Sequence, residues 1–109
     1  MAGRLEIKIS NNFLEWGLRA IRVEGCESGE VSNNTVKYFA DNGVYCRSAE
    51  NVIVSNNNLF NMGHNSLLSI YSRNCQFIGN HCKDGWGAPI CNYGSLNISY
   101  RDNNIENCN

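Results

Sequence analysis

Residues 52–59 read Val52-Ile53-Val54-Ser55-Asn56-Asn57-Asn58-Leu59, and the asparagine at position 57 returns at a fixed interval along the chain. Asparagine stands at positions 11, 34, 57, 80 and 103, so that each is 23 residues after the previous one. Four equal spacings in succession are hard to obtain by chance, even in a chain with 19 asparagines. The interval predicts an internal repeat, which is the sequence signature of a solenoid.

Apolar and small residues keep the same register around the repeated asparagine. Residues at the same position in successive copies form a column. The columns are Val36, Leu59, Cys82 and Ile105, two positions after the asparagine; Val31, Val54, Phe77 and Tyr100, three before; Gly29, Val52, Cys75 and Ile98, five before; and Ile21, Val44, Leu67 and Ile90, ten after. The first copy aligns better on Asn12, with one residue missing from the turn that follows. That alignment adds Ile7, Ile9 and Leu14 to the columns.

Each copy reads as two short apolar stretches separated by polar turns. Alternation of apolar and polar residues at period two predicts strands with one face turned inward. The second stretch is clearest at residues 43–48 and 66–71, which are rich in residues that favour strands. One copy cannot bury its apolar side alone, whereas stacked copies create a continuous core.

Two solenoids have repeats of this length, the parallel β-helix and the leucine-rich repeat. The chain has only seven leucines, and the second half of each copy is short and β-rich, without a helical return. The sequence therefore favours an all-β, right-handed, single-stranded parallel β-helix of four to five 23-residue coils. A leucine-rich-repeat-like solenoid is the alternative. In a β-helix, the repeated asparagines are expected to hydrogen-bond from coil to coil as a ladder.

The segment from Asn42 to Leu59 resembles the repeats of pectin-lyase-like right-handed β-helix proteins. That superfamily includes polysaccharide lyases, galacturonan hydrolases, alginate epimerases and phage tail-spike domains. The resemblance runs from about Leu5 to Cys108 and implies a single β-helix domain over residues 1–109, or a fragment of a longer solenoid. Because structural residues carry the resemblance, it implies the fold and leaves the activity open.

Composition excludes several classes of protein. With 42% hydrophobic and 17% charged residues, the chain is too apolar to be disordered. A net charge of -1 argues against a general electrostatic grip on nucleic acid or on an anionic membrane. No apolar run approaches the roughly 20 residues of a membrane span. Residues 1–9 lack the apolar run of a secretory signal, which favours a cytoplasmic location.

Most of the six cysteines are predicted to be free, small, buried apolar residues rather than a disulfide scaffold. They are Cys26, Cys46, Cys75, Cys82, Cys91 and Cys108. A zinc site would have to combine Cys75, His81, Cys82 and Cys91, whose spacings match no zinc motif. The sequence thus predicts neither a metal nor a cofactor.

The outward positions of the second strand suggest an interface. Four of them, Leu68, Ile70, Cys91 and Tyr93, are expected to form an apolar patch on adjacent coils. Such patches mark partner interfaces or ligand grooves. The alternative is that the inward and outward faces are exchanged, so that these residues are core. No amphipathic helix covers either end of the repeat, so homo-oligomers are predicted, packed end to end or through this patch.

A polysaccharide is the other candidate partner. Tyr45, Trp86 and Tyr93 are candidate rings for stacking on sugars, and Arg47 is a candidate polar contact beside them. Trp86 has an alternative role as a cover over the core at its turn. A non-catalytic module that binds carbohydrate or another protein is the function that these residues favour.

Candidate catalytic residues are Asp41, His64 and Asp84. Asp41 and His64 occupy one column, so they are expected on adjacent coils about 5 Å apart, where the carboxylate can orient a general base. Asp84 is the candidate second carboxylate of a glycosidase. A solvated or turn-capping role is the alternative for these side chains. If the chain is an enzyme, the resemblance implies a polysaccharide lyase or glycoside hydrolase.

The catalytic signatures of the resembling families are incomplete in this sequence. Galacturonan hydrolases carry an Asn-Thr-Asp, an Asp-Asp and a Gly-His-Gly segment. Residues 63–65, Gly-His-Asn, match the last only in part, and the other two are absent. The sequence therefore favours a protein that is not an enzyme.

Overall fold

The computed structural model describes residues 5–108, and these residues form strands and turns without a helix. The strands are β1 (Glu6–Ser10), β2 (Phe13–Gly17), β3 (Ile21–Glu24), β4 (Ser28–Ser32), β5 (Thr35–Phe39), β6 (Val44–Arg47), β7 (Val52–Ser55), β8 (Asn58–Met62), β9 (Leu67–Ile70), β10 (Gln76–Ile78), β11 (His81–Lys83), β12 (Ile90–Tyr93), β13 (Ser99–Arg101) and β14 (Asn104–Glu106). Residues 1–4, part of the segment considered for a secretory signal, and residue 109 lie outside the described range.

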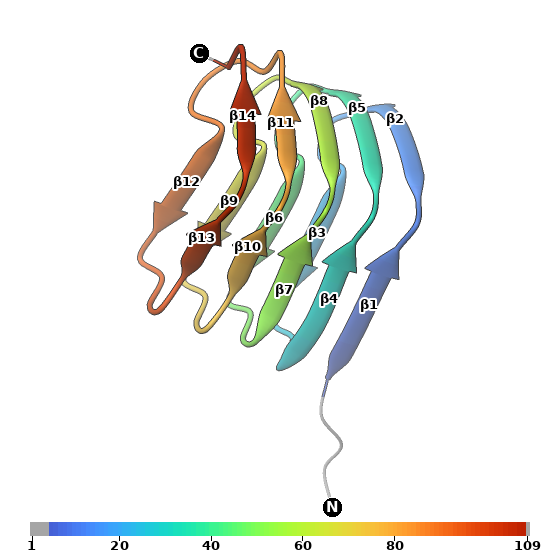
Figure 1. Ribbon diagram of the computed structural model, residues 1–109. Coiled ribbons are helices and arrows are strands. Elements are labelled where there is room, and N and C mark those ends of the chain that lie inside the picture. Colours follow the sequence, from blue (N-terminus) through green and yellow to red (C-terminus); the bar gives the residue numbers. More distant parts are fainter. Residues whose placement is uncertain (1–4, 109) are drawn as a thin grey trace, which may run out of the picture.

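The strands wind into a solenoid with three parallel sheets (Figure 1). Sheet A has the order β1-β4-β7-β10-β13, sheet B the order β2-β5-β8-β11-β14, and sheet C the order β3-β6-β9-β12. Each full coil contributes one strand to each sheet. The described residues thus make four full coils and two strands of a fifth, which confirms the predicted parallel β-helix. The leucine-rich-repeat alternative is wrong, because each coil returns through a strand.

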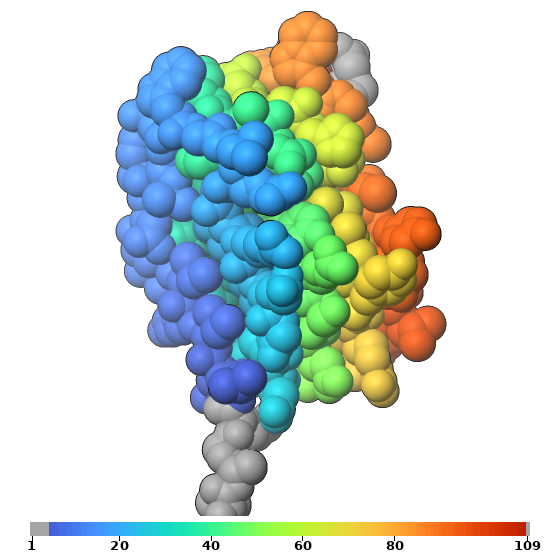
Figure 2. All heavy atoms as spheres, turned by 180° about the vertical axis from the view of Figure 1, so that it is seen from behind, coloured from blue at the N-terminus to red at the C-terminus, as the bar shows by residue number. Residues whose placement is uncertain are grey.

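The register follows the 23-residue interval. Val54 pairs with Val31 on one side and with Phe77 on the other. In the first coil, Ile9 pairs with Val31, 22 residues on, while Ile21 pairs with Val44, 23 residues on. The missing residue therefore lies in the turn between β2 and β3, as the alignment on Asn12 predicted. Figure 2, which views the opposite face, shows the coils as adjacent bands in sequence order.

The core is built from the inward columns, that is, from residues at the same position in successive coils. Each column stacks like on like, so that Val31, Val54 and Phe77 lie one above another and are fully buried. Burying one such side chain contributes about 1.5–3 kcal/mol. Since no coil covers its own apolar side, this stabilisation exists only between neighbouring coils.

The asparagine ladder closes the corner between sheets A and B. Asn57 is fully buried, and its Oδ1 accepts from the backbone N–H of Asn34 at 3.0 Å and from Asn34 Nδ2 at 2.9 Å. Its Nδ2 donates to Asn80 Oδ1 at 2.9 Å and to the carbonyl of Val31 at 3.0 Å. The same contacts recur from Asn12 to Asn103. The predicted ladder is confirmed, and it satisfies a polar corner inside the core.

Left-handed backbone residues make these corners tight. The residue before each ladder asparagine has a positive φ, for example 61° at Asn11, 57° at Asn33 and 54° at Asn56. Asparagine adopts this conformation at lower cost than most residues, which explains much of the asparagine content. The same turns direct the chain from one sheet into the next.

All six cysteines are free thiols in the structure. Four are buried, while Cys91 and Cys108 are half-buried. Burial raises the pKa of Cys82 to about 12, because the thiolate would lose its hydration. The cysteines therefore contribute to packing as small apolar residues, as predicted from the sequence.

Candidate functional site

The outward face of sheet C carries two columns. One holds Arg22, Tyr45, Leu68 and Cys91, and the other holds Glu24, Arg47, Ile70 and Tyr93. Val44 and Cys46, which alternate with these residues on β6, are fully buried. The alternative in which the two faces are exchanged is therefore wrong.

The predicted apolar patch is contiguous but narrow. Leu68 pairs with Cys91, and Ile70 pairs with Tyr93. Leu68 lies between Tyr45 and Cys91 on the neighbouring strands and is only 7% exposed. Ile70 and Cys91 are half-buried, whereas Tyr93 is 61% exposed. Tyr93 is thus the one member of the patch with a large accessible surface, and a role in an interface stays a prediction.

A second tyrosine joins Tyr93 on this face. Tyr71 follows β9 in a left-handed turn, with φ of 49°, and its ring meets that of Tyr93 edge to face. The ring centroids are 5.6 Å apart, and the planes are inclined by 71°. A Cβ at Gly94 would lie 2.6 Å from the Tyr71 ring, so glycine lets the ring rest on the backbone. A hydrogen bond with Tyr93 raises the pKa of the Tyr71 phenol.

Arg47 lies beside these tyrosines. The pKa of its guanidinium is raised, first by a hydrogen bond with Tyr45 and then by the charge interactions with Tyr45, Glu24 and Tyr71. Arg22 lies over the Tyr45 ring at 5.2 Å from its centroid. Tyr45 therefore contacts two arginines and is only 8% exposed. Tyr71, at 54% exposed, offers a larger ring surface to a ligand.

Asp41 and His64 lie on adjacent coils in the turn between sheets B and C. Nδ1 of His64 is 3.5 Å from Oδ1 of Asp41, and the imidazole side chain is 63% exposed. Nε of Arg19 donates to Oδ2 of Asp41 at 3.1 Å. The carboxylate thus lies between a guanidinium and an imidazole, an arrangement that can orient a base, although catalysis stays a prediction.

Asp84 and Trp86 lie on one coil, which is the next coil after that of His64 and the second after that of Asp41. Asp84 follows β11, two coils from Asp41 or roughly 9.6 Å along the axis, and its Oδ1 accepts from Asn107 Nδ2 at 2.7 Å. Its side chain lines a different part of the surface from Asp41. Trp86 is 69% exposed, so it does not cover the core. The structure therefore does not bring Asp84 into the contacts that Asp41 makes.

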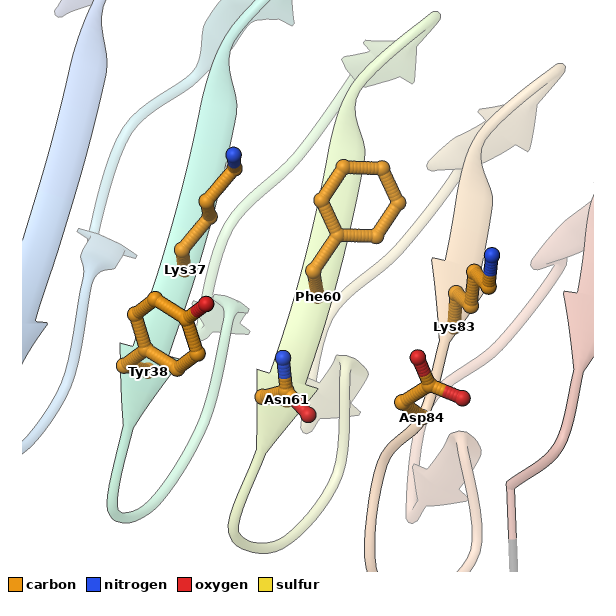
Figure 3. Close-up of a pocket in the computed structure, with 6 residues that line it drawn as sticks. All are labelled: Lys37, Tyr38, Phe60, Asn61, Lys83 and Asp84. Carbon is orange, nitrogen blue, oxygen red and sulfur yellow. The ribbon is translucent and has the colours of Figure 1, made fainter.

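A shallow hollow of about 220 Å³ lies on sheet B (Figure 3). It is lined by Lys37, Tyr38, Phe60, Asn61, Lys83 and Asp84. These side chains come from the ends of β5, β8 and β11 and are the same two positions in three successive coils. We call this feature the sheet B hollow.

The sheet B hollow is framed by rings and cations. The Lys37 ammonium lies 5.7 Å from the ring centroid of Phe13 and 5.8 Å from that of Phe60. The ring of His81 meets Phe60 edge to face at 5.5 Å, and its Nε2 is 2.8 Å from Oε1 of Glu106. Phe60 is consequently held from two sides.

The sequence matches the family described as "Right handed beta helix region" over residues 2–109. The chain belongs to the right-handed β-helix family. No curated protein sequence matches it significantly. In this right-handed β-helix protein, the repeat consists of the core columns and the ladder. The outward residues described above do not belong to the repeat.

Three features of this β-helix protein were missed from its sequence. The contact of Arg19 with Asp41 was missed because the first coil is one residue shorter, so the two residues are 22 rather than 23 positions apart. Tyr71 lies in a turn rather than in an outward strand column. The sheet B hollow was missed because only the outward positions of the strands that form sheet C were considered. The 23-residue spacing of Lys37, Phe60 and Lys83 was the pattern that could have indicated it.

Within residues 5–108, no group of three or more His, Cys, Asp or Glu side chains gathers as metal ligands would. The described part of the chain also contains no helix with the length and hydrophobicity needed to cross a membrane.

Proposed function

We propose that this β-helix module binds a polysaccharide along the outward face of sheet C and has no catalytic centre. The observation that carries the proposal is the Tyr71–Tyr93 pair, two exposed rings fixed edge to face beside Arg47. Tyrosine supplies a large, rigid, amphipathic surface with little side-chain entropy to lose on binding. Such a ring suits the apolar face of a sugar.

The spacing of the face supports a chain-like ligand. Tyr93, Ile70 and Arg47 lie on three successive strands, so that Arg47 is roughly 9.6 Å from Tyr93 along the axis. A guanidinium offers several N–H donors in a fixed plane, which suits sugar hydroxyl or carboxylate oxygens. A glycan lying across the strands would therefore meet the rings and the cation in sequence.

Binding of soluble polysaccharides to Tyr93→Ala tests this proposal. The probes are a neutral β-glucan, a galactan and polygalacturonate, and the readout is retardation in affinity electrophoresis. Tyr93→Ala is expected to weaken binding tenfold or more, about 1.4 kcal/mol. Leu5→Ala is the matched control, because Leu5, which precedes β1 of sheet A, is 62% exposed and Tyr93 is 61% exposed. Equal loss in both variants, or no binding to any probe, would refute the proposal.

Self-association by head-to-tail stacking is a second candidate, because the side-chain hydrogen bonds of the ladder all run in one direction along the axis. Among the described residues, the backbone N–H of Asn103 has no acceptor and Oδ1 of Asn12 has no donor, while each rung between them is complete. A second copy stacked head to tail would join this donor to this acceptor. Light scattering across a concentration range tests it, and a monomer at all concentrations would contradict it.

Hydrolysis or elimination on a polysaccharide is a third candidate, favoured by the contact between Asp41 and His64. In this proposal the exposed imidazole takes a proton from the substrate or from water, and Asp41, held by Arg19, orients it. His64→Ala is expected to abolish turnover of polygalacturonate, whereas His81→Ala is not. Absence of turnover in the parent, or unchanged turnover in His64→Ala, removes this candidate.

A further inference from the structure

We propose that copies of this chain join head to tail in one fixed register, and that two glutamates, Glu15 and Glu106, face each other across the seam and limit its growth. The partner is a second copy, whose β1 and β2 lie on β13 and β14 of the first. The proposal rests on the stacking described above as the second candidate function. It adds the register of the contact and the residues that oppose it.

Strand pairing fixes which residues would meet at the seam. Among the described strands, β1 and β13 are the outer strands of sheet A, and β2 and β14 are those of sheet B (Figure 1). All pairings are parallel, so a coil added in the same direction continues each column. One column of sheet A holds Lys8, Glu30, Ile53, Gln76 and Ser99. Lys8 of the next copy would therefore pair with Ser99.

The seam consists of sheets A and B. In sheet C, β12 belongs to the coil before that of β13 and β14. The β3 strand of the next copy would thus lie two strand spacings from β12, too far to pair with it. Two of the three sheets are continued across the contact.

Apolar residues in matching columns favour the contact. Ile9 and Tyr100 belong to one inward column of sheet A, and Leu14 and Ile105 belong to one inward column of sheet B. Ile9, Leu14 and Tyr100 are only half-buried, and Ile105 is exposed, because each lies on an outer strand. In the proposed register, Ile9 of one copy covers Tyr100 of the other, and Leu14 covers Ile105. Burial of these side chains favours stacking as it does between coils of one copy.

Two exposed leucines would also meet at the seam. Leu5 lies three residues before Lys8, and Leu96 lies three residues before Ser99. They are 62% and 67% exposed. Because Lys8 and Ser99 would pair, the two leucines occupy equivalent positions on adjacent coils of the stack. The register thus covers both of these apolar side chains.

One outward column of sheet B opposes the contact. It holds Glu15, Lys37, Phe60, Lys83 and Glu106 in the five coils. Within one copy, each of the two acids stands next to a lysine. At the seam, Glu106 would instead be followed by Glu15 of the next copy, one strand spacing or roughly 4.8 Å away. Like charges directly opposite each other on neighbouring strands are destabilising.

Both glutamates are exposed on outer strands of the described chain. Glu15 forms no ion pair within residues 5–108, and Oε1 of Glu106 is 2.8 Å from Nε2 of His81. Charged side chains on exposed strand edges oppose pairing with another chain. A head-to-tail contact does not close on itself, so without such an opposing charge it would propagate into a filament.

Charge reversal tests the register. Glu15→Lys converts the contact between two acids into a contact between opposite charges, and so does Glu106→Lys. The double variant restores a contact between like charges. Glu30→Lys is the matched control, because it makes the same change of charge on β4, which is not an outer strand. Sedimentation velocity across a concentration range, in low and in high salt, gives the association constants, and thermal unfolding checks that each variant is folded.

Each single seam variant should associate about threefold or more tightly than the parent, whereas the double variant and Glu30→Lys should stay within twofold of it. High salt should strengthen association of the parent and weaken that of the single seam variants, because it screens repulsion and attraction alike. Equal association of all variants, or a double variant as tight as the single ones, overturns the register and the role of the glutamates but leaves stacking standing. Absence of association in every variant overturns both. Polysaccharide binding at Tyr93 is measured separately, so its failure is distinguishable from either result.

Discussion

Replacement of Asn57 by alanine is the sharpest test of the asparagine ladder. Asn57 is the middle rung and is fully buried. The substitution removes two bonds that its Nδ2 donates, to Asn80 Oδ1 and to the carbonyl of Val31, and two that its Oδ1 accepts from Asn34. Because Asn57 is fully buried, the groups that lose their partners do not face bulk solvent.

The expected cost follows from the groups left without partners. Two N–H groups of Asn34, one on its backbone and one on its side chain, lose their acceptor inside the protein. Each buried, unsatisfied donor costs about 1–3 kcal/mol. The unfolding free energy of Asn57→Ala should therefore fall by about 2–6 kcal/mol. Asn57→Asp should be at least as harmful, because the oxygen that replaces Nδ2 would face two acceptors, Asn80 Oδ1 and the carbonyl oxygen of Val31.

Asn12→Ala is the matched control on the same ladder. Asn12 is exposed, and its Nδ2 donates to Asn34 Oδ1 at 3.0 Å and to the Ser10 carbonyl at 3.2 Å. Oδ1 of Asn34 keeps its bond from the Asn12 backbone N–H, at 3.0 Å. Water can reach the groups that are released, so the expected cost is about 1 kcal/mol or less.

Urea unfolding followed by circular dichroism gives the free energies, and amide hydrogen exchange gives the local readout. In Asn57→Ala, the backbone N–H of Asn34 should exchange faster than the amides of the same coil that keep their acceptors. Equal costs for Asn57→Ala and Asn12→Ala, with unchanged exchange at Asn34, would show that the ladder does not stabilise the corner.

Three further outcomes are expected from the packing and the titrating groups. Phe77→Ala should lower the unfolding free energy by about 3–5 kcal/mol, because the ring is fully buried, whereas Ile53→Ala, on the outward face of β7, should change it by less than about 1 kcal/mol in the same urea titration. Gly43→Ala should lower the thermal midpoint, since its Cβ would lie 2.6 Å from a backbone carbonyl of the next coil; an unchanged midpoint would contradict this register. Burial raises the pKa of Cys82 and of Tyr100 to about 12, from 9.0 and 10.0, so the folded state favours their protonated forms. Stability should hold below about pH 9 and fall as the pH rises to about 12, and denaturant midpoints that do not change across this window would contradict it.

The fold was readable from the sequence because a solenoid repeats its environment. Every coil imposes the same inward positions, so the columns around Asn34, Asn57 and Asn80 predicted both the register and the ladder. The same reasoning placed Asp41 and His64 on adjacent coils. Periodicity carries this information because residues that stack in space are 22 or 23 apart in sequence.

The outward surface was less predictable, for reasons that particular residues illustrate. Leu68 has an outward position but is covered by its neighbours on adjacent strands, so direction alone did not give its exposure. Tyr71 reaches Tyr93 from a turn, where side-chain direction depends on the local φ of 49°. Turn geometry and the packing of long side chains do not follow the repeat, and no periodic pattern records them.

The uniform register has a consequence for how the chain folds. Because each strand pairs only with the strand one coil away, nearly every tertiary contact closes a loop of about the same length. The contact order is therefore set by the coil and not by the number of coils. Once two coils have paired, each further coil adds one such closure and one new layer of core. The pairing of the first two coils is then expected to be the slowest step of folding, after which the other coils add one at a time.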